Sequence, residues 1–279
     1  MKNSVIFTTY NSPAWLEKVL WGFFEQTVKD FEIVIADDGS RTDTRDLIER
    51  MRISSPMPIQ HIWQEDDGFQ KCRILNKAIV AAQGNYLIFT DGDCIPRADF
   101  VEQHLRLSEH GTYLSGGYFL LPLDISQAIT HEDVVAQRPF DLTWLRERGL
   151  KKSIKDWKLM ARGGWATFLN AISPTRATWN GHSASCHKEF AIAVNGFEET
   201  MQYGGQDCEF GDRLVHLGVK PKRIRYSAIC VHLDHKRGYV TDDMLANSRR
   251  IREHTKASRK ILATGGIARY LPGLEGPAS

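Results

Sequence analysis

Acidic residues follow two apolar runs in the first hundred residues of the chain. Asp91 and Asp93 flank Gly92 directly after the run 86–89, and an Asp-Asp-Gly-Ser turn at 37–40 follows another apolar run. Carboxylate oxygens are hard ligands that suit Mg²⁺ or Mn²⁺ bridging a diphosphate. One Asp-x-Asp is often only a solvated turn. Two acidic strand ends favour a site for a metal and phosphate.

Two histidines could add nitrogen ligands to such a site. His232 and His235 lie in the segment 231–235, which follows a short apolar run. Imidazole suits a borderline metal such as manganese, and we expect His232 to be the ligand in preference to His235. The same spacing also fits an ordinary loop. The sequence has no His-Glu-x-x-His motif, which argues against a zinc hydrolase.

The elements that must position these residues alternate between strand and helix patterns. The apolar runs predict strands at 4–9, 31–36, 59–63 and 86–90, and apolar residues at helical spacing predict helices at 13–26, 42–51 and 72–82. This alternation predicts an α/β fold with a parallel sheet covered by helices on both faces. Ligands of open parallel sheets bind beyond the carboxyl ends of the strands. The polar segments 9–11, 37–40 and 91–93 should therefore meet there.

After residue 96 the alternation of strand and helix patterns becomes less regular. We expect another strand at 112–121, one or two amphipathic helices within 141–169, and a basic helix at 240–262. The basic, aromatic segment 151–168 and the helix around 249–260 could contact an anionic membrane. The alternative is that both are simply solvated charged faces.

Bulk properties narrow the class of protein. The 279 residues are 42% hydrophobic and carry a net charge of only +2, so we expect a globular protein with no nucleic-acid partner. Five cysteines without paired spacing fit a reducing compartment. No leader pattern and no stretch of about 20 apolar residues is evident. We therefore expect a cytoplasmic protein, with peripheral membrane contact as an option.

Four segments together resemble the nucleotide-binding half of family 2 glycosyltransferases, which have the GT-A fold. The resemblance covers roughly residues 3–105 and rests on 8–11 (Thr-Thr-Tyr-Asn), 31–40, 68–76 with Gly68, Arg73 and Asn76, and 84–93. A GT-A fold implies a Rossmann-like, mostly parallel central sheet flanked by helices, with a C-terminal region that binds the acceptor.

The resemblance also implies roles for the strand-end residues. The residues matching Thr9, Tyr10 and Asp38 hold the base and neighbouring groups of a nucleotide, usually uridine. We expect Asn11 and Gly92, in the same motifs, to bind the nucleotide as well. Asp91 contacts the ribose, and Asp93 ligates Mn²⁺ or Mg²⁺ together with His232. Arg73 could neutralise phosphate, or could be a solvated helix charge.

The segment 204–214 resembles a stretch shared by β-1,4-galactosyltransferases and bacterial capsule polymerases. There, a Gly-Gly-acid-Asp sequence opens a helix in the acceptor site, and the position matching Asp207 carries the catalytic base. We expect Gly205 and Gln206, which precede it, to bind the substrate, although Gln206 stands where an acid is common. The alternative for Asp207 is an ordinary helix cap.

The segment 179–185 combines an aromatic ring with a polar glycine turn. We expect Trp179, Asn180, Gly181 and His182 to line the pocket for the donor sugar and the acceptor, because an aromatic face and hydrogen-bonding groups can orient a sugar ring. The alternative is a buried tryptophan beside a polar turn.

Together these features predict an inverting glycosyltransferase that uses a UDP-sugar and a saccharide or lipid-linked saccharide acceptor, in bacterial surface polysaccharide or lipopolysaccharide synthesis. Residues 1–105 would bind the donor, 106–240 would complete the same domain, and 241–279 would form a basic helix and tail. A sugar nucleotidyltransferase would carry a glycine-rich basic loop after the first strand, where this chain has 9–13 (Thr-Tyr-Asn-Ser-Pro). A non-catalytic carbohydrate-binding module would not need Asp91, Asp93 and Asp207 together.

Overall fold

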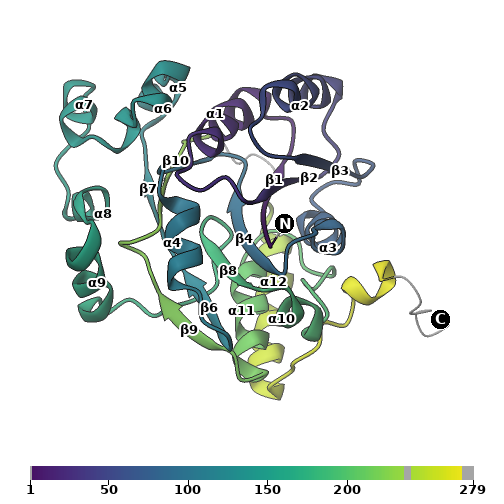
Figure 1. The fold of residues 1–279 in the computed structure, drawn as a ribbon. Helices are drawn as coiled ribbons and strands as arrows, with labels where there is room; N and C mark the ends of the chain where they lie inside the picture. Colours follow the sequence, from purple (N-terminus) through teal and green to yellow (C-terminus); the bar gives the residue numbers. More distant parts are fainter. Residues whose placement is uncertain (1, 236–239, 272–279) are drawn as a thin grey trace.

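A seven-stranded sheet runs through the centre of the computed structural model, which describes residues 2–235 and 240–271 (Figure 1). The strand order is β3-β2-β1-β4-β8-β6-β9. The first four strands are parallel, β8 is antiparallel to β4 and β6, and β9 is parallel to β6. The strands are β1 (Asn3–Thr9), β2 (Glu32–Asp37), β3 (Ile59–Trp63), β4 (Tyr86–Asp91), β6 (Thr112–Ser115), β8 (Ala184–His187) and β9 (Lys220–Arg223).

The central strands are buried on both faces, which explains their continuous apolar runs. Val5, Phe7 and Ile35 pack on one face with α1 (Pro13–Phe24), α2 (Thr42–Ser54) and α4 (Phe100–Leu107). Ile6 and Val34 point the other way. They pack in a second core with α3 (Lys71–Ala81), α10 (Lys188–Ala193) and α11 (Gln206–His216). The predicted α/β sheet covered on both faces is confirmed.

A second, three-stranded sheet has the order β5-β10-β7. Its strands are β5 (Cys94–Pro96), β7 (Gly117–Leu120) and β10 (Ile229–His232). The expectation of one strand over 112–121 is therefore wrong. The backbone N–H of Gly116 donates to Ser183, whereas that of Gly117 donates to Ala228, so the chain changes partners and enters the other sheet at this point.

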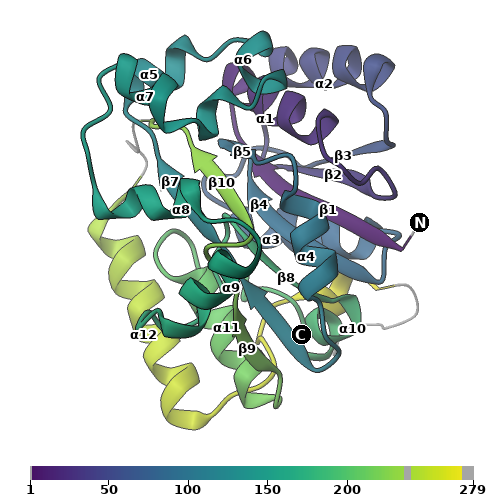
Figure 2. The same cartoon turned by 60° about the vertical axis from the view of Figure 1, so that its left-hand side comes forward.

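A helical segment lies along one side of the molecule (Figure 1; turned forward in Figure 2). It contains α5 (Leu123–Ala128), α6 (His131–Val135), α7 (Leu142–Glu147), α8 (Trp157–Met160) and α9 (Gly163–Ile172), with 3₁₀ turns at Arg138–Phe140 and Ile154–Asp156. The one or two helices expected within 141–169 are thus three short ones. Asp141 is the N-cap of α7, and its side chain accepts from the backbone N–H of Thr143.

The C-terminal part of the chain returns to the second core. α12 (Asp242–Ser258) lies beside α11, and a 3₁₀ turn follows at Ile267–Tyr270. The predicted basic helix is present but shorter than 240–262. Across the described residues, no helix combines the length and apolar character needed to cross a bilayer.

Candidate active site

The carboxyl ends of β1, β2 and β4 meet at one edge of the sheet, as expected. Thr9 is in register with Asp37, and Thr8 with Asp91. The backbone N–H of Gly92 donates to the carbonyl of Thr8 at 2.9 Å, and a Cβ at position 92 would lie 2.5 Å from that oxygen. Glycine is therefore required for β4 to close this tightly on β1.

Asp38 lies buried just beyond β2. Its carboxylate accepts from the Gln64 side-chain amide at 2.6 Å and from the backbone N–H of Gln70 at 2.9 Å. Burial raises the pKa of Asp38 to about 6, because the loss of solvation outweighs these two hydrogen bonds. Asp38 is thus an acceptor whose charge depends on pH near neutrality.

The loop after β1 offers an aromatic surface beside Asp38. Tyr10 is 46% exposed, and its hydroxyl donates to Asp66, which raises the pKa of the phenol. The Thr9 hydroxyl is shielded and has no hydrogen-bond partner in the part of the chain that the structure describes. Asn11 instead braces the loop, because its side-chain oxygen accepts from the backbone N–H of Arg41.

Lys71, at the start of α3, is a site residue that the sequence reasoning missed. Its ammonium contacts Asp91 Oδ1 at 2.6 Å. Burial disfavours the charge on Lys71, but Asp91, Asp207 and Asp93 outweigh burial and raise its pKa. Burial likewise opposes ionisation of Asp91, yet Lys71 holds the pKa of Asp91 below its usual range. Asp91 and Lys71 therefore form a charged pair at the site.

Arg73 lies two residues after Lys71 on α3. Its guanidinium contacts Asp67 at 3.2 Å and is about one third exposed. The cation that the structure brings to the carboxylates is Lys71, whereas phosphate binding by Arg73 stays a prediction. Lys71 precedes the helix predicted at 72–82, whereas α3 begins at Lys71 itself.

Asp93 faces two histidines from β10 and the residues after it. Its Oδ2 lies 2.9 Å from His235 Nε2 and 3.6 Å from His232 Nε2. The pairing of β10 with β5 aligns His232 with Cys94 and so brings it next to Asp93. His232 Nδ1 lies 2.9 Å from the carbonyl of Leu233, which favours the tautomer with its proton on Nδ1 and a lone pair on Nε2.

These donors fit a divalent metal. Asp93, Cys94 and His232 place ligand atoms within 4.8 Å of one another. Sulfur is a soft ligand that suits zinc or copper better than Mn²⁺ or Mg²⁺, so we do not count Cys94 among the ligands of such an ion. The remaining carboxylate oxygen and imidazole nitrogen suit Mn²⁺ or Mg²⁺. The structure brings His235 to the same carboxylate as His232.

His182 and Tyr118 border the candidate metal ligands. The two rings meet edge to face with centroids 4.3 Å apart, and Tyr118 also approaches His232. Burial lowers the pKa of His182 to about 3, so this imidazole is neutral. Lys158 on α8 donates to the Tyr118 carbonyl at 2.9 Å, and burial lowers its pKa to about 8. Tyr118 and Lys158 were not predicted from the sequence.

Asp207 enters the same region from the first turn of α11. Gly205, with φ +95°, is the N-cap, and the Gln206 side chain accepts from the backbone N–H of Gly204 to hold the turn. Burial raises the pKa of Asp207, although Lys71 and the backbone N–H of Gly181 oppose the shift. Asp207 Oδ1 is shielded and has no hydrogen-bond partner in the described residues. A carboxylate of raised basicity with a free oxygen suits a general base.

The structure corrects the expectation for Trp179. Its ring is fully buried and packs against Phe89, Tyr113 and Phe210, which leaves no face for a sugar. The side-chain oxygen of Asn180 accepts from the backbone N–H of Ser183 and so shapes the turn. Gly181 and His182 are the residues of this segment that reach the carboxylates.

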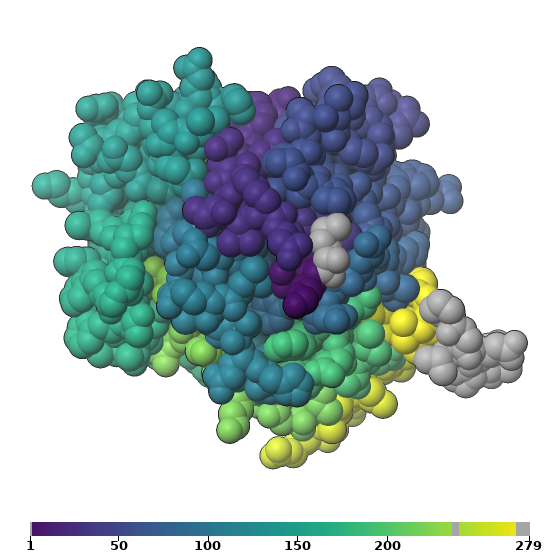
Figure 3. Space-filling model, in the orientation of Figure 1, coloured from purple at the N-terminus to yellow at the C-terminus, as the bar shows by residue number. Residues whose placement is uncertain are grey.

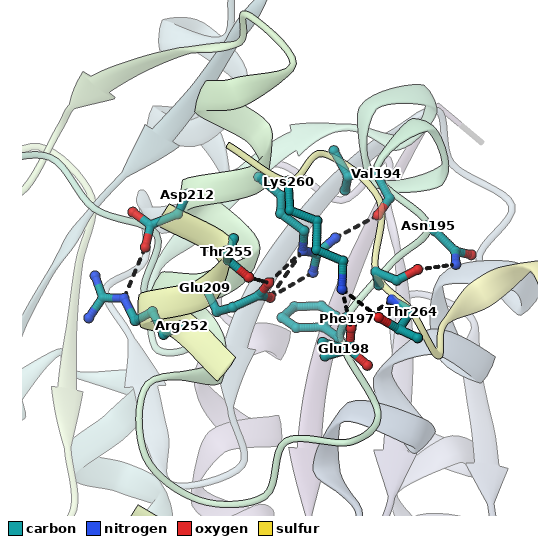
Figure 4. A network of polar contacts seen from close by, with 12 residues as sticks. Val194, Asn195, Phe197, Glu198, Glu209, Asp212, Arg252, Thr255, Lys260 and Thr264 are labelled. Carbon is teal, nitrogen blue, oxygen red and sulfur yellow. Dashed lines mark hydrogen bonds and ion pairs between the residues drawn. The ribbon is translucent and has the colours of Figure 1, made fainter. Parts of the chain in front are cut away.

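A buried polar network fixes the helix that carries Asp207 (Figure 4). Glu209 and Arg213 are fully buried and paired one turn apart on α11. Thr255 of α12 donates to Glu209 at 2.9 Å, and Arg213 also donates to the carbonyl of Val194. α11 is therefore tied to α12 and to the end of α10.

Known proteins share this fold. A mannosyltransferase from Pyrobaculum calidifontis, solved in complex with GDP-Man and Mn²⁺, aligns with a TM-score of 0.56 at 19% identity over 92% of this chain and 61% of its own. Residues 1–349 of S. aureus TarS, solved with UDP-GlcNAc, align with a TM-score of 0.58 at 16% identity over 96% of this chain and 69% of that one. The fold is that of the GT-A glycosyltransferases.

Curated relatives agree in class. A chondroitin synthase of Escherichia coli is 27% identical over 77% of this chain and 32% of its own length. A validoxylamine A glucosyltransferase of Streptomyces hygroscopicus subsp. jinggangensis is 26% identical over 90% of this chain and 60% of its own. The chain thus spans between a third and three fifths of these relatives. The model of the glycosyl transferase family 2 matches residues 4–157, more than half of the chain and past residue 105. The chain belongs to glycosyl transferase family 2.

Proposed function

We propose that this chain is a metal-dependent, inverting glycosyltransferase that transfers a sugar from a UDP-sugar to a saccharide acceptor. One observation carries the proposal: the carboxylates of the candidate donor site and the carboxylate of the candidate base lie around Lys71. Asp91 ends β4, Asp93 follows it beside His232, and the charge of Asp207 on α11 acts on the same lysine. A donor site and a candidate base are thus contiguous.

The residues of the first half suit a nucleotide. Asp38 can accept from an N–H of the base, and the exposed ring of Tyr10 can lie against it. Asp91 can accept from a ribose hydroxyl. A divalent ion held by Asp93 and His232 would offset the charge of the diphosphate. The relatives solved with UDP-GlcNAc or GDP-Man support a nucleotide-sugar donor, and uridine is the base we propose.

Asp207 is the proposed general base. Its carboxylate would take the proton of the acceptor hydroxyl as that oxygen bonds to the anomeric carbon and the bond from this carbon to the phosphate oxygen breaks. Attack opposite the leaving diphosphate inverts the anomeric centre. Lys71 lies where it can stabilise the departing negative charge.

We further propose that the acceptor is a saccharide, free or lipid-linked, and that the product is part of a bacterial surface polysaccharide or lipopolysaccharide. Support comes from the relatives, which include the chondroitin synthase and a putative teichuronic acid biosynthesis glycosyltransferase of Bacillus subtilis. The likeness of residues 204–214 to galactosyltransferases, the division at residues 105 and 240, and a cytoplasmic location belong to the same proposal.

Calorimetric titration with UDP, with and without Mn²⁺, tests the donor site. We expect Mn²⁺ to tighten binding in the wild type and in Asp207→Asn, and Asp93→Ala to lose the Mn²⁺ effect. Release of UDP from UDP-sugars should fall about 10²- to 10⁴-fold in Asp207→Asn, because a general base contributes that much.

Two results would contradict the proposal separately. Absence of UDP binding in every condition removes the uridine assignment, and GDP is then the next nucleotide to test. Full activity of Asp207→Asn with normal UDP binding removes the proposed base but leaves the donor site standing.

A further inference from the structure

The α8–α9 segment exposes an unusual amount of apolar surface. α9 carries Trp165, Phe168 and Ile172 at the i, i+3, i+7 spacing of one helix face, and these side chains are 46%, 49% and 58% exposed. Trp157 and Met160 of α8 are exposed beside them. We call these five residues the aromatic face.

The inner side of α9 is small and polar. Ala166 and Asn170, one turn apart, are its buried residues, and the Asn170 amide bonds to Ser227 and Tyr226. A helix of a globular domain normally turns its apolar stripe inward and its polar side to water. α9 does the reverse, so its aromatic stripe contributes little to the core.

The members of the aromatic face contact one another. The rings of Trp165 and Phe168 stack with centroids 5.3 Å apart, and Trp157 meets Trp165 edge to face at 5.9 Å. α8 and α9 form the left margin of the molecule in Figure 1, and the space-filling view shows atoms of this region on the surface (Figure 3). A contiguous apolar patch of this kind marks an interaction surface.

The segment that carries the aromatic face is positively charged. Residues 151–176 contain six lysines and arginines and one acid, a net charge of +5 against +2 for the whole chain, and five of the six cations are exposed, Lys158 being buried. The one acid, Asp156, is paired with Arg146. Lys151, Lys152 and Lys155 are exposed. Exposed aromatic rings within a cationic segment complement the surface of a bilayer that contains anionic lipids.

We propose that the aromatic face of α8 and α9 docks this protein on an anionic lipid bilayer. The other basic helix, α12, does not share the pattern. Its apolar residues Met244, Leu245 and Ile251 are partly buried, and α12 packs against α11. Docking requires neither a nucleotide nor an acceptor, so this proposal stands apart from the proposed transfer reaction.

Vesicle sedimentation tests the proposal on the full chain. The probes are vesicles of phosphatidylcholine alone and vesicles that also contain phosphatidylglycerol. We expect binding to the anionic vesicles, weakened as NaCl rises from about 0.1 M to about 0.5 M because salt screens the charge. Trp165→Ser with Phe168→Ser should weaken binding about tenfold or more through the lost apolar area, and Lys151→Glu with Lys155→Glu should weaken it as well.

Matched variants separate the face from the rest of the surface. Ile53→Ser, at a 90% exposed position on α2, controls for loss of an exposed apolar residue, and Arg249→Glu with Arg250→Glu on α12 controls for charge. Both controls should bind anionic vesicles like the wild type. Every substituted side chain is exposed, and an unchanged melting temperature will confirm folding.

Three results would overturn docking on a membrane. One is failure of the wild type to sediment with anionic vesicles at low salt. Another is an equal loss in the control variants. The third is self-association by light scattering that the Trp165→Ser/Phe168→Ser variant abolishes, without vesicle binding, because the face would then join two copies of the chain.

Discussion

Three carboxylates of the candidate site differ in their surroundings, and their chemistry differs accordingly. Asp91 is held ionised by Lys71, whereas burial raises the pKa values of Asp38 and Asp207. Environments that push carboxyl pKa values apart are how one site assigns separate roles to the same functional group. An ionised Asp91 suits a permanent acceptor, and a more basic Asp207 suits proton transfer.

Nucleotide binding should depend on pH through Asp38. Its pKa is about 6 in the folded protein, and the ionised carboxylate is a stronger acceptor for a base N–H than the protonated carboxyl. Between pH 8 and pH 5 the carboxyl goes from ionised to about nine tenths protonated, so UDP affinity should fall by up to about tenfold from this cause. Asp38→Asn should bind UDP more weakly at pH 8 and lose this part of the pH dependence.

Titration calorimetry at pH 5, 6, 7 and 8 measures the effect of Asp38. Asp67→Asn, an exposed carboxylate, is the control and should retain the wild-type profile. Identical profiles for wild type and Asp38→Asn would show that the titrating group is elsewhere, for example on the UDP phosphate.

Lys71 and Arg73 should differ in their effect on activity. Lys71→Met removes the cation that lowers the pKa values of Asp91 and Asp207. The base must be deprotonated to act, so the acidic limb of the kcat/KM profile should move to higher pH. Arg73→Met should leave the profile in place, because Arg73 pairs with Asp67. A shift in Arg73→Met alone would reverse these assignments.

At the scale of elements, α11 is held in place by buried charge. Glu209 and Arg213 are both inaccessible to solvent, and the Glu209 carboxylate accepts from Arg213 and from Thr255 (Figure 4). The neighbouring pair Asp212–Arg252 joins the same two helices nearer the surface. Asp207 is two residues from Glu209, so the network also sets the position of the candidate base.

Loss of one partner of the buried pair should be costly. Glu209→Ala leaves the Arg213 guanidinium buried without its carboxylate and should lower the free energy of unfolding by about 3–5 kcal/mol. Arg252→Ala, which breaks the more exposed pair, should cost at most about 1 kcal/mol. Urea unfolding measures both. Equal losses would show that burial of the pair does not matter.

At the scale of the molecule, the sheet is continuous across the two halves of the chain. β4 of the first half pairs with β8 of the second, and β8 continues the sheet to β6 and β9. β10 in turn lies between β5 and β7. Residues 1–105 thus share backbone hydrogen bonds with the remainder and do not form a separate layer.

Unfolding of the whole chain should therefore occur in one transition. We expect tryptophan fluorescence and far-UV circular dichroism to give the same urea midpoint, because the two halves share one sheet through the pairing of β4 with β8. Two separate midpoints would indicate that the nucleotide-binding half is stable on its own. Activity should disappear over the same urea range as the folded signal.

Local sequence patterns determined the first four strands and the three helices between them. Strands buried on both faces must be apolar throughout, and helices that cover them must carry an apolar stripe. Both patterns of apolar residues are therefore visible in the sequence. Asp38, Asp91 and Asp93 were predicted at one edge because parallel strands place their carboxyl ends together. The structure confirms this edge.

Only the tertiary structure decided contacts between residues distant in the chain. Lys71 on α3 contacts Asp91 on β4, and the charge of Asp207 on α11 also acts on it. Trp179 is buried because it packs against residues of several elements, among them β4 and α11. The pattern of α9 could not reveal that its aromatic stripe faces outward, because the same spacing describes a core helix. The spacing of apolar residues determines which of them share a face of a helix or strand, whereas the packing of the whole chain determines what that face contacts.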